Sequence, residues 1–137
     1  MRRLRSVHQV TLLLDTNAFL WFIEGQDRFS LETLRLIEDT SNEVFVSVVG
    51  LWEIAIKVSL KKLELTEAFH ALIPREMERN NIELLATKLE HFGKLAQLPF
   101  HHRDPFDRLL AAQALVENIP VISSDNFLDA YGVSRTW

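Results

Sequence analysis

The sequence predicts an α/β fold, a three-layer α/β/α sandwich with a central parallel sheet of about five strands. Short apolar and β-branched runs alternate along the 137 residues with longer segments of helical periodicity, which is typical of a parallel sheet with helical crossovers. The first run, residues 10–14, is apolar except for Thr11, as expected for a strand covered on both faces. No repeat or linker divides the chain, so we expect a single domain over residues 1–137.

Five segments are expected to form the strands of this sheet. Four of them are short runs rich in apolar and β-branched residues, and the last is expected at an edge. They are residues 10–14, 44–47, 82–85, 120–123 and 133–137.

The segments between these strands carry helix start and stop signals. Gly25 and Gly132 are suited to end a helix, and Ser30 is suited to begin one by capping its N-terminus. We expect helices at 16–24, after Ser30, at 48–61, at 66–79, after position 87, from 105 to about 118 and at 126–131.

Three of these helices carry particular local patterns. Pro74 predicts a break or kink within 66–79, because proline lacks the backbone N–H that a helix interior needs. Thr87 and Glu90 match a capping box for the helix that follows. Asp104 before Pro105 matches an N-cap followed by proline at the first helical position.

Composition narrows the class of protein without identifying its partner. Hydrophobic residues make up 47% of the chain and charged residues 25%, as in ordinary globular proteins. The absence of cysteine excludes disulfides and thiolate metal sites and fits a cytoplasmic protein. No apolar run is long enough to span a membrane, and Asp15 interrupts the only run that resembles a signal peptide.

The charge balance neither favours nor excludes a nucleic-acid partner. The net charge is −4, but setting four acidic residues aside as metal ligands leaves 15 of the 19 against 15 basic residues. Residues 1–9 are expected to form a flexible arm. Its arginines, Arg2, Arg3 and Arg5, belong either to a frayed tail or to a phosphate contact.

Four acidic residues stand where a parallel sheet would gather them: Asp15, Glu53, Asp107 and Asp125. Asp15 and Asp125 each follow a predicted strand, and open parallel sheets bind ligands beyond the carboxyl ends of their strands. A buried cluster of like charges needs a compensating cation. Oxygen ligands suit Mg²⁺ or Mn²⁺, and such sites commonly support phosphodiester hydrolysis.

Each of these acids also has a simple structural explanation. Asp15 and Asp125 are good N-capping residues. Glu53 stands four residues before Lys57, which is the spacing of a helical ion pair. Asp107 falls in a first helical turn, where the helix dipole favours an acid.

Neighbouring polar residues leave further alternatives. Asp104 competes with Asp107 for the third acidic position, but capping is its expected role. His101 and His102 match no zinc spacing, so we expect a solvated loop there. Lysines and arginines near the acids are candidates for phosphate contacts or are solvated surface charges: Lys57, Lys61, Arg103 and Arg108.

Two polar residues and the aromatic residues complete the candidates. Asn17 and Ser124 either hydrogen-bond a site carboxylate or a metal-bound water, or stabilise turns. Tyr131 and the tryptophans are expected in the core or at an interface.

Four blocks of the sequence resemble, in order, the signature blocks of the PIN-domain nucleases. They are LLLDTNAFLW, VFVSVVGLWEIAIK, HHRDPFDRLLAAQA and PVISSDNFLDAYGV. The sequence is most similar to the VapC-like ribonuclease toxins of prokaryotic toxin–antitoxin pairs. The resemblance implies a parallel sheet of about five strands, Mg²⁺- or Mn²⁺-dependent RNA cleavage, homodimerisation and inhibition by a small antitoxin.

The same resemblance assigns the four acids. It makes Asp15 the first metal ligand, Glu53 the acid of the second block, Asp107 the third acid and Asp125 the fourth. Ser124 falls where the family usually has Thr or Ser before that last acid.

The predicted function is therefore endonucleolytic cleavage of RNA by a metal-dependent toxin. One alternative is a PIN-fold interaction module without catalysis. Another is a small-molecule phosphohydrolase of the aspartyl-phosphate kind, but Asn17 occupies the position where that chemistry favours a second Asp. Apolar residues near 30–40 and 66–79 are candidates for a dimer surface.

Overall fold

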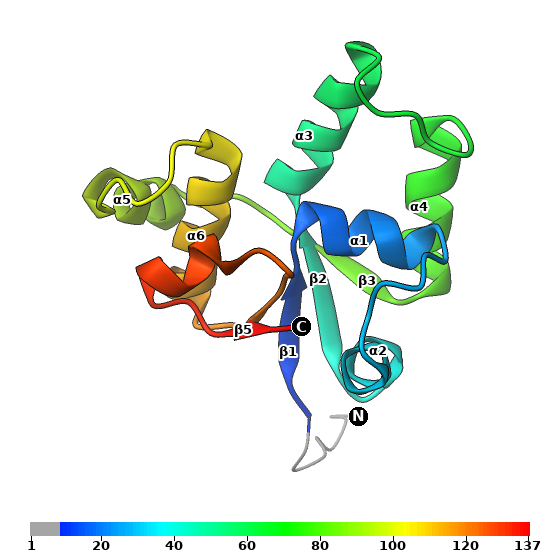
Figure 1. Cartoon of the computed structure of the whole chain (residues 1–137), viewed down its shortest axis with the longest axis horizontal. Coiled ribbons are helices and arrows are strands. Elements are labelled where there is room, and N and C mark those ends of the chain that lie inside the picture. The colour runs from blue at the N-terminus through cyan, green and yellow to red at the C-terminus, as the bar shows by residue number, and fades with distance from the viewer. Residues whose placement is uncertain (1–8) are drawn as a thin grey trace.

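Five parallel strands form one sheet in the order β3-β2-β1-β4-β5 (Figure 1). The computed structural model describes residues 9–137, so most of the arm expected at residues 1–9 lies outside the described residues, including its three arginines. The strands are β1 (Thr11–Leu14), β2 (Glu43–Ser47), β3 (Ile82–Leu85), β4 (Val121–Ile122) and β5 (Arg135–Thr136). The structure thus confirms all five expected strands, with β4 and β5 shorter than expected and β5 at an edge.

Helices connect the strands and cover the sheet. They are α1 (Thr16–Ile23), α2 (Leu31–Glu38), α3 (Val48–Ser59), α4 (Phe69–Arg79), α5 (Leu89–Gln97) and α6 (Pro105–Glu117), with a 3₁₀ helix η1 (Asn126–Tyr131) before β5. Ser30 caps α2 by accepting a hydrogen bond from the Thr33 N–H at 3.1 Å. Asp104 caps α6 by accepting from the Phe106 and Asp107 N–H groups. These two capping predictions are confirmed.

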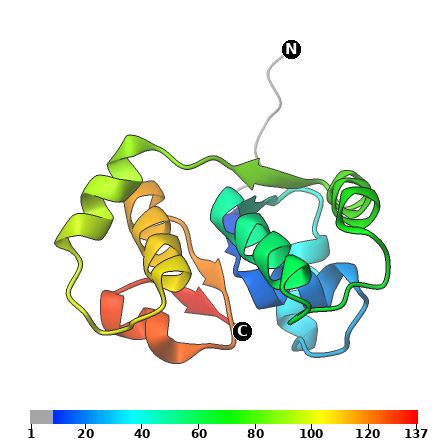
Figure 2. The same cartoon turned by 90° about the horizontal axis from the view of Figure 1, so that it is seen from above.

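The sheet separates two apolar cores, which confirms the three-layer sandwich. Leu12 and Leu14 of β1 pack on one face with α1, α2 and α4. Leu13, between them, packs on the other face with α5 and α6. Figures 1 and 2 show these helix layers on opposite sides of the sheet. Because β1 is covered on both faces, its three fully buried positions, residues 12–14, are all leucine, and only the partly buried Thr11 is polar.

Strand order places a crevice at the carboxyl end of β1. The chain runs from β1 through β2 to β3 on one side and then places β4 and β5 on the other. The Asp15 N–H donates to the Ile122 carbonyl at 3.1 Å, so the residues that follow β1 and β4 start side by side. Such a reversal of strand order is where open α/β sheets bind ligands.

Two local predictions about helices differ from the structure. Helix α4 runs from Phe69 to Arg79 with Pro74 inside it, so the break expected at this proline is wrong, and the alternative of a kink stays a prediction. Helix α5 begins after Lys88 rather than at a Thr87 capping box. The Lys88 N–H instead donates to Nδ1 of His91 at 3.0 Å, and His91 is fully buried. Burial against α6 decides this helix start, and a local sequence pattern does not contain that information.

A buried chain of hydrogen bonds links β2, α5 and α6. Ser47 Oγ donates to Oε1 of Gln113, whose side chain is fully buried. Gln113 Nε2 lies 3.3 Å from Nδ1 of His91, and His91 Nε2 lies 3.4 Å from Glu117. Ser47 also caps α3 by accepting from the Val49 N–H at 3.0 Å. The chain therefore connects the start of α3 to the opposite helix layer.

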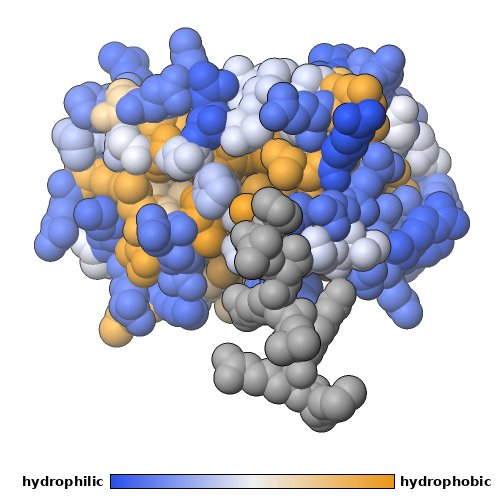
Figure 3. Space-filling model, turned by 90° about the horizontal axis from the view of Figure 1, so that it is seen from below, coloured by the Kyte–Doolittle hydropathy of each residue, from blue (hydrophilic) through white to orange (hydrophobic). Residues whose placement is uncertain are grey.

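No helix in residues 9–137 is both long and apolar enough to cross a bilayer. Figure 3 views the molecule from the amino ends of the strands, where hydrophilic residues surround smaller hydrophobic patches.

We predict that Gln113→Ala lowers the free energy of unfolding by about 1–3 kcal/mol, because it leaves the buried Ser47 hydroxyl without its acceptor. The exposed Gln97 of α5 provides a matched control. Its replacement by Ala should change stability by less than about 0.5 kcal/mol. Urea unfolding of both variants measures the difference, and equal effects would contradict a structural role for the buried chain.

Candidate active site

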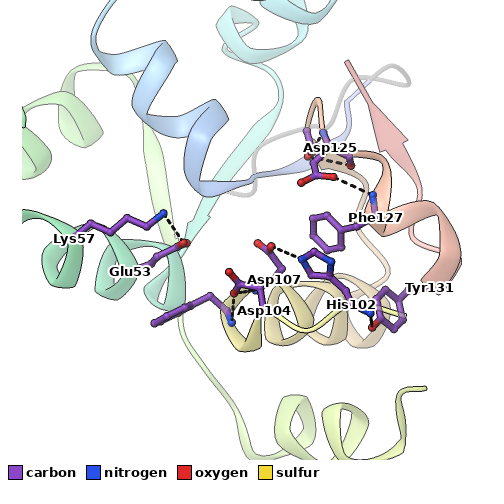
Figure 4. A network of polar contacts seen from close by, with 10 residues as sticks. Glu53, Lys57, His102, Asp104, Asp107, Asp125, Phe127 and Tyr131 are labelled. Carbon is purple, nitrogen blue, oxygen red and sulfur yellow. Dashed lines mark hydrogen bonds and ion pairs between the residues drawn. The ribbon is translucent and has the colours of Figure 1, made fainter. Parts of the chain in front are cut away.

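The four acids expected to meet all line one pocket of about 140 Å³ at the carboxyl edge of the sheet. Asp15 follows β1 and Asp125 follows the neighbouring β4. Glu53 comes from α3 and Asp107 from the first turn of α6, and these two helices pack together. Figure 4 shows Glu53, Asp107 and Asp125 facing the same space. The pocket is lined by Asp15, Thr16, Asn17, Glu53, Lys57, Asp104, Asp107, Asp125 and Phe127.

The simple structural explanations for these acids also hold. Asp15 Oδ1 accepts from the Ala18 N–H at 2.7 Å and caps α1. Asp125 Oδ1 accepts from the Phe127 N–H at 3.2 Å and caps η1. Glu53 Oε2 lies 3.0 Å from Nζ of Lys57. Since one oxygen makes each contact, capping or pairing is compatible with a place in the pocket.

Asp107 has a partner that sequence reasoning missed. His102 Nε2 lies 2.8 Å from Asp107 Oδ2, and the imidazole stacks on the Phe127 ring (Figure 4). The expectation that the two histidines form only a solvated loop is therefore wrong for His102. No local signal marks this contact, because it depends on how the loop before α6 folds back on η1.

Burial and like charge act together on Asp15. Burial raises the pKa of the Asp15 carboxyl, and repulsion from Asp125 and Glu53 adds to this. Hydrogen bonds from Ser123 and from the Ala18 N–H oppose the rise in pKa. The ionised side chain is thus costly in this pocket.

The same causes raise the pKa of Asp107 to about 6. Burial is the largest cause, and repulsion from Asp104 and Glu53 adds to it. The hydrogen bond from His102 lowers the pKa but does not offset the burial. Two of the four acids therefore lie in surroundings that a cation would stabilise.

Two neighbouring serines differ in their position at the pocket. Ser124, the residue expected to support the site, is exposed. Ser123 is fully buried, hydrogen-bonds the Asp15 side chain, and accepts from the Asp125 N–H at 3.0 Å. Asn17 lines the pocket, as expected for a residue near its acids.

A close approach of α1 and α3 brings Glu53 to the pocket. A Cβ atom at Gly50 would lie 3.0 Å from Oγ1 of Thr16, so glycine is suited to this contact. Gly50 lies three residues before Glu53, which is about one helical turn.

The basic residues proposed for phosphate contacts lie in different surroundings. Lys57 lines the pocket. Arg108 instead donates to the Leu98 carbonyl at 3.0 Å and lies over the Phe100 ring at 4.1 Å. These contacts give Arg108 a role in holding the loop before α6.

Among the aromatics, Tyr131 is buried as expected, whereas Trp52 is 59% exposed.

The pocket has the donor chemistry for a divalent cation. Its carboxylate oxygens match the preference of Mg²⁺ and Mn²⁺. Burial, with a smaller contribution from neighbouring acids, raises the pKa values of Asp15 and Asp107, so a bound cation would stabilise their ionised forms. Within residues 9–137, however, no three acidic or histidine side chains are already arranged as a metal site. The residue types in the pocket suit a divalent cation. Their carboxylate oxygens, however, do not converge on one point.

Comparisons with known proteins place the chain in a family. An α/β sheet with acids at its carboxyl edge defines the class, and residues 12–133 match the PIN domain family. This match covers most of the chain, so the chain belongs to the PIN-domain family. A search of curated proteins found no match.

Several solved structures share the fold. VapBC2 from Rickettsia felis, bound to a DNA fragment from its promoter, matches with TM-score 0.72 and 17% identity over 93% of this chain and 98% of that chain. DNA-bound VapBC from Salmonella typhimurium matches with TM-score 0.68 and 18% identity over 93% and 97%. FitAcB from Neisseria gonorrhoeae matches with TM-score 0.60 and 19% identity over 92% and 96%.

We predict that Asp107→Asn stabilises the metal-free protein near neutral pH. The carboxyl ionises near its ordinary value of 3.8 in the unfolded chain and near 6 in the folded protein. Its destabilising effect is therefore absent below pH 3.8, grows as pH rises, and is complete above about 6. Urea unfolding in EDTA should show a more stable variant at about pH 7.5 and a much smaller difference at about pH 3.5.

The exposed Glu83 of β3 offers a control, because Glu83→Gln also removes a carboxylate. This variant should show no comparable gain near neutral pH. An Asp107→Asn protein equal to the parent at both pH values would contradict the electrostatic account of the pocket.

Proposed function

We propose that this protein is a metal-dependent endoribonuclease that hydrolyses RNA phosphodiester bonds. The observation that carries the proposal is the meeting of four carboxylates from β1, α3, α6 and η1 in one pocket. Membership of the PIN-domain family and the four blocks that resemble PIN-domain nucleases support it.

In this proposal Asp15 and Asp107 hold Mg²⁺ or Mn²⁺, and Glu53 and Asp125 complete the ligand set directly or through water. When bound, such an ion supplies Lewis acidity for phosphodiester hydrolysis. Lys57 lines the pocket and forms an ion pair with Glu53. In this proposal its ammonium group also contacts an RNA phosphate. Ser123 orients the Asp15 carboxylate by its hydrogen bond.

We further propose that the chain is the toxin of a toxin–antitoxin module, acts in the cytoplasm as a homodimer, and is inhibited by a small antitoxin. The sequence resemblance to VapC-like toxins supports this setting. The fold similarity to proteins of the VapBC structures from two organisms is consistent with it.

We predict that Asp15→Asn abolishes RNA cleavage while the protein stays folded, because a charged ligand is lost at nearly constant volume. Cleavage of structured RNA is measured with Mg²⁺, with Mn²⁺ and with EDTA, and circular dichroism checks the fold. The exposed Asp27 offers a matched control, since Asp27→Asn should leave the rate unchanged. Parental activity in Asp15→Asn would refute the role of Asp15.

The same assay separates the alternatives. Turnover of a small phosphate ester without RNA cleavage would indicate a phosphohydrolase. Inactivity with both metals on both substrates would indicate an interaction module.

We also predict that overexpression of the chain arrests growth, and that a small protein encoded beside it relieves the arrest. Growth curves with the parent and with Asp15→Asn measure this effect. Equal toxicity of both proteins would show that the arrest does not depend on the acidic pocket.

A further inference from the structure

We propose that His102 and Phe127 position two of the acids relative to one another, and we call this pair the His102–Phe127 bridge. The bridge joins Asp107 on α6 to Asp125 before η1, and His102 acts as a positioning residue for metal binding. This inference rests on the proposed function, because it assigns the bridge to the same pocket.

The first half of the bridge is the hydrogen bond to Asp107. His102 Nε2 lies 2.8 Å from Asp107 Oδ2. When the carboxyl group is ionised it can only accept, so Nε2 is then the donor. In the described part of the chain, Asp107 Oδ1 accepts no hydrogen bond from another residue. His102 thus occupies one oxygen, holds the carboxylate plane, and leaves the second oxygen for a cation.

The second half of the bridge is the stack on Phe127. The two ring centroids lie 4.5 Å apart with an angle of 19° between the ring planes. The Phe127 N–H in turn donates to the Asp125 carboxylate. Asp107 and Asp125 are therefore joined by a continuous path of two hydrogen bonds and one ring stack (Figure 4).

Tyr131 fixes the backbone of the bridge. The His102 N–H donates to the Tyr131 hydroxyl at 3.0 Å, and Tyr131 is a buried residue of η1. The ring of His101 packs edge-on against the same tyrosine at 5.2 Å. The loop before α6 therefore contacts η1 through both histidines, and the imidazole of His102 has little freedom to turn away from Asp107.

The contact between His102 and Asp107 has a role at the pocket in addition to any contribution to folding stability. The side chains of His102 and Asp107 are each 30% exposed, and partly exposed ion pairs contribute little to folding. The N-terminus of α6 already has Asp104 as its cap. Groups that hydrogen-bond a metal-binding carboxylate, in contrast, commonly change metal affinity by 10–100-fold.

The first experiment measures Mn²⁺ binding to the full chain without RNA, using the EPR signal of free Mn²⁺. We expect His102→Ala to weaken binding by about 10–100-fold. His102→Gln should recover much of this loss, because its amide nitrogen can take the place of Nε2. His102→Asn is the matched control, because it carries the same amide on a shorter side chain and should not rescue binding.

The second experiment tests whether Phe127 acts through His102. Phe127→Leu keeps an apolar side chain but removes the stack, and should also weaken Mn²⁺ binding. In a double-mutant cycle, the effects of His102→Ala and Phe127→Leu should be less than additive, because both break the same path. NMR of the metal-free protein should show shifts of the Asp125 and Phe127 amide signals in His102→Ala.

The outcomes separate the inference from the proposed function. If the parent protein binds no Mn²⁺, the proposed metal-dependent function fails. If the parent binds and His102→Ala binds equally well, the bridge is refuted while the proposed function stands. Additive effects in the cycle, or equal weakening by the Gln and Asn variants, would also refute it. Urea unfolding of each variant shows whether a loss of Mn²⁺ affinity comes from a loss of folded protein. If His102→Ala is unfolded, the comparison of Mn²⁺ affinity between His102→Gln and the parent decides the question.

Discussion

The burial of neighbouring carboxylates at the end of β1 is the constraint to which the rest of the site responds. Burial and like charge raise the pKa values of Asp15 and Asp107. Around them, backbone N–H groups, Ser123, Lys57 and His102 provide the hydrogen bonds and positive charge that the pocket contains. Local bonding reduces the repulsion without removing it, which is the electrostatic condition expected of a site that binds a divalent cation.

The sheet makes this concentration of charge possible. The carboxyl ends of parallel strands lie at one edge of the sheet, and the reversal of strand order between β1 and β4 leaves room there. The two apolar cores hold α3 and α6 against this edge, so that Glu53 and Asp107 approach from the helices. The stability of the cores thus offsets the cost of the acidic pocket.

Polar contacts also join parts of the chain that apolar packing alone would not align. The buried Gln113 links the capping residue of α3 to α5. The loop before α6 is held on one side by Arg108 and on the other by Tyr131. Directional bonds of this kind define one relative arrangement of elements, and here they surround the acids on which the proposed chemistry depends.

The sequence by itself determined the strand and helix order and the meeting of Asp15 and Asp125, because apolar runs and the positions of these acids after strands are local features. Glu53 and Asp107 were predicted to join them from the resemblance of their sequence blocks to those of a known family, and both line the same pocket. Tertiary structure decided the rest. Pro74 stays within a helix and His91 replaces the expected capping box. Ser123 rather than Ser124 contacts Asp15, and His102 contacts Asp107. The residues in some of these contacts are close in sequence, but burial and packing against remote segments decide their conformations: His91 lies against Glu117 of α6 and His102 stacks on Phe127 of η1. Short-range spacing does not encode that packing.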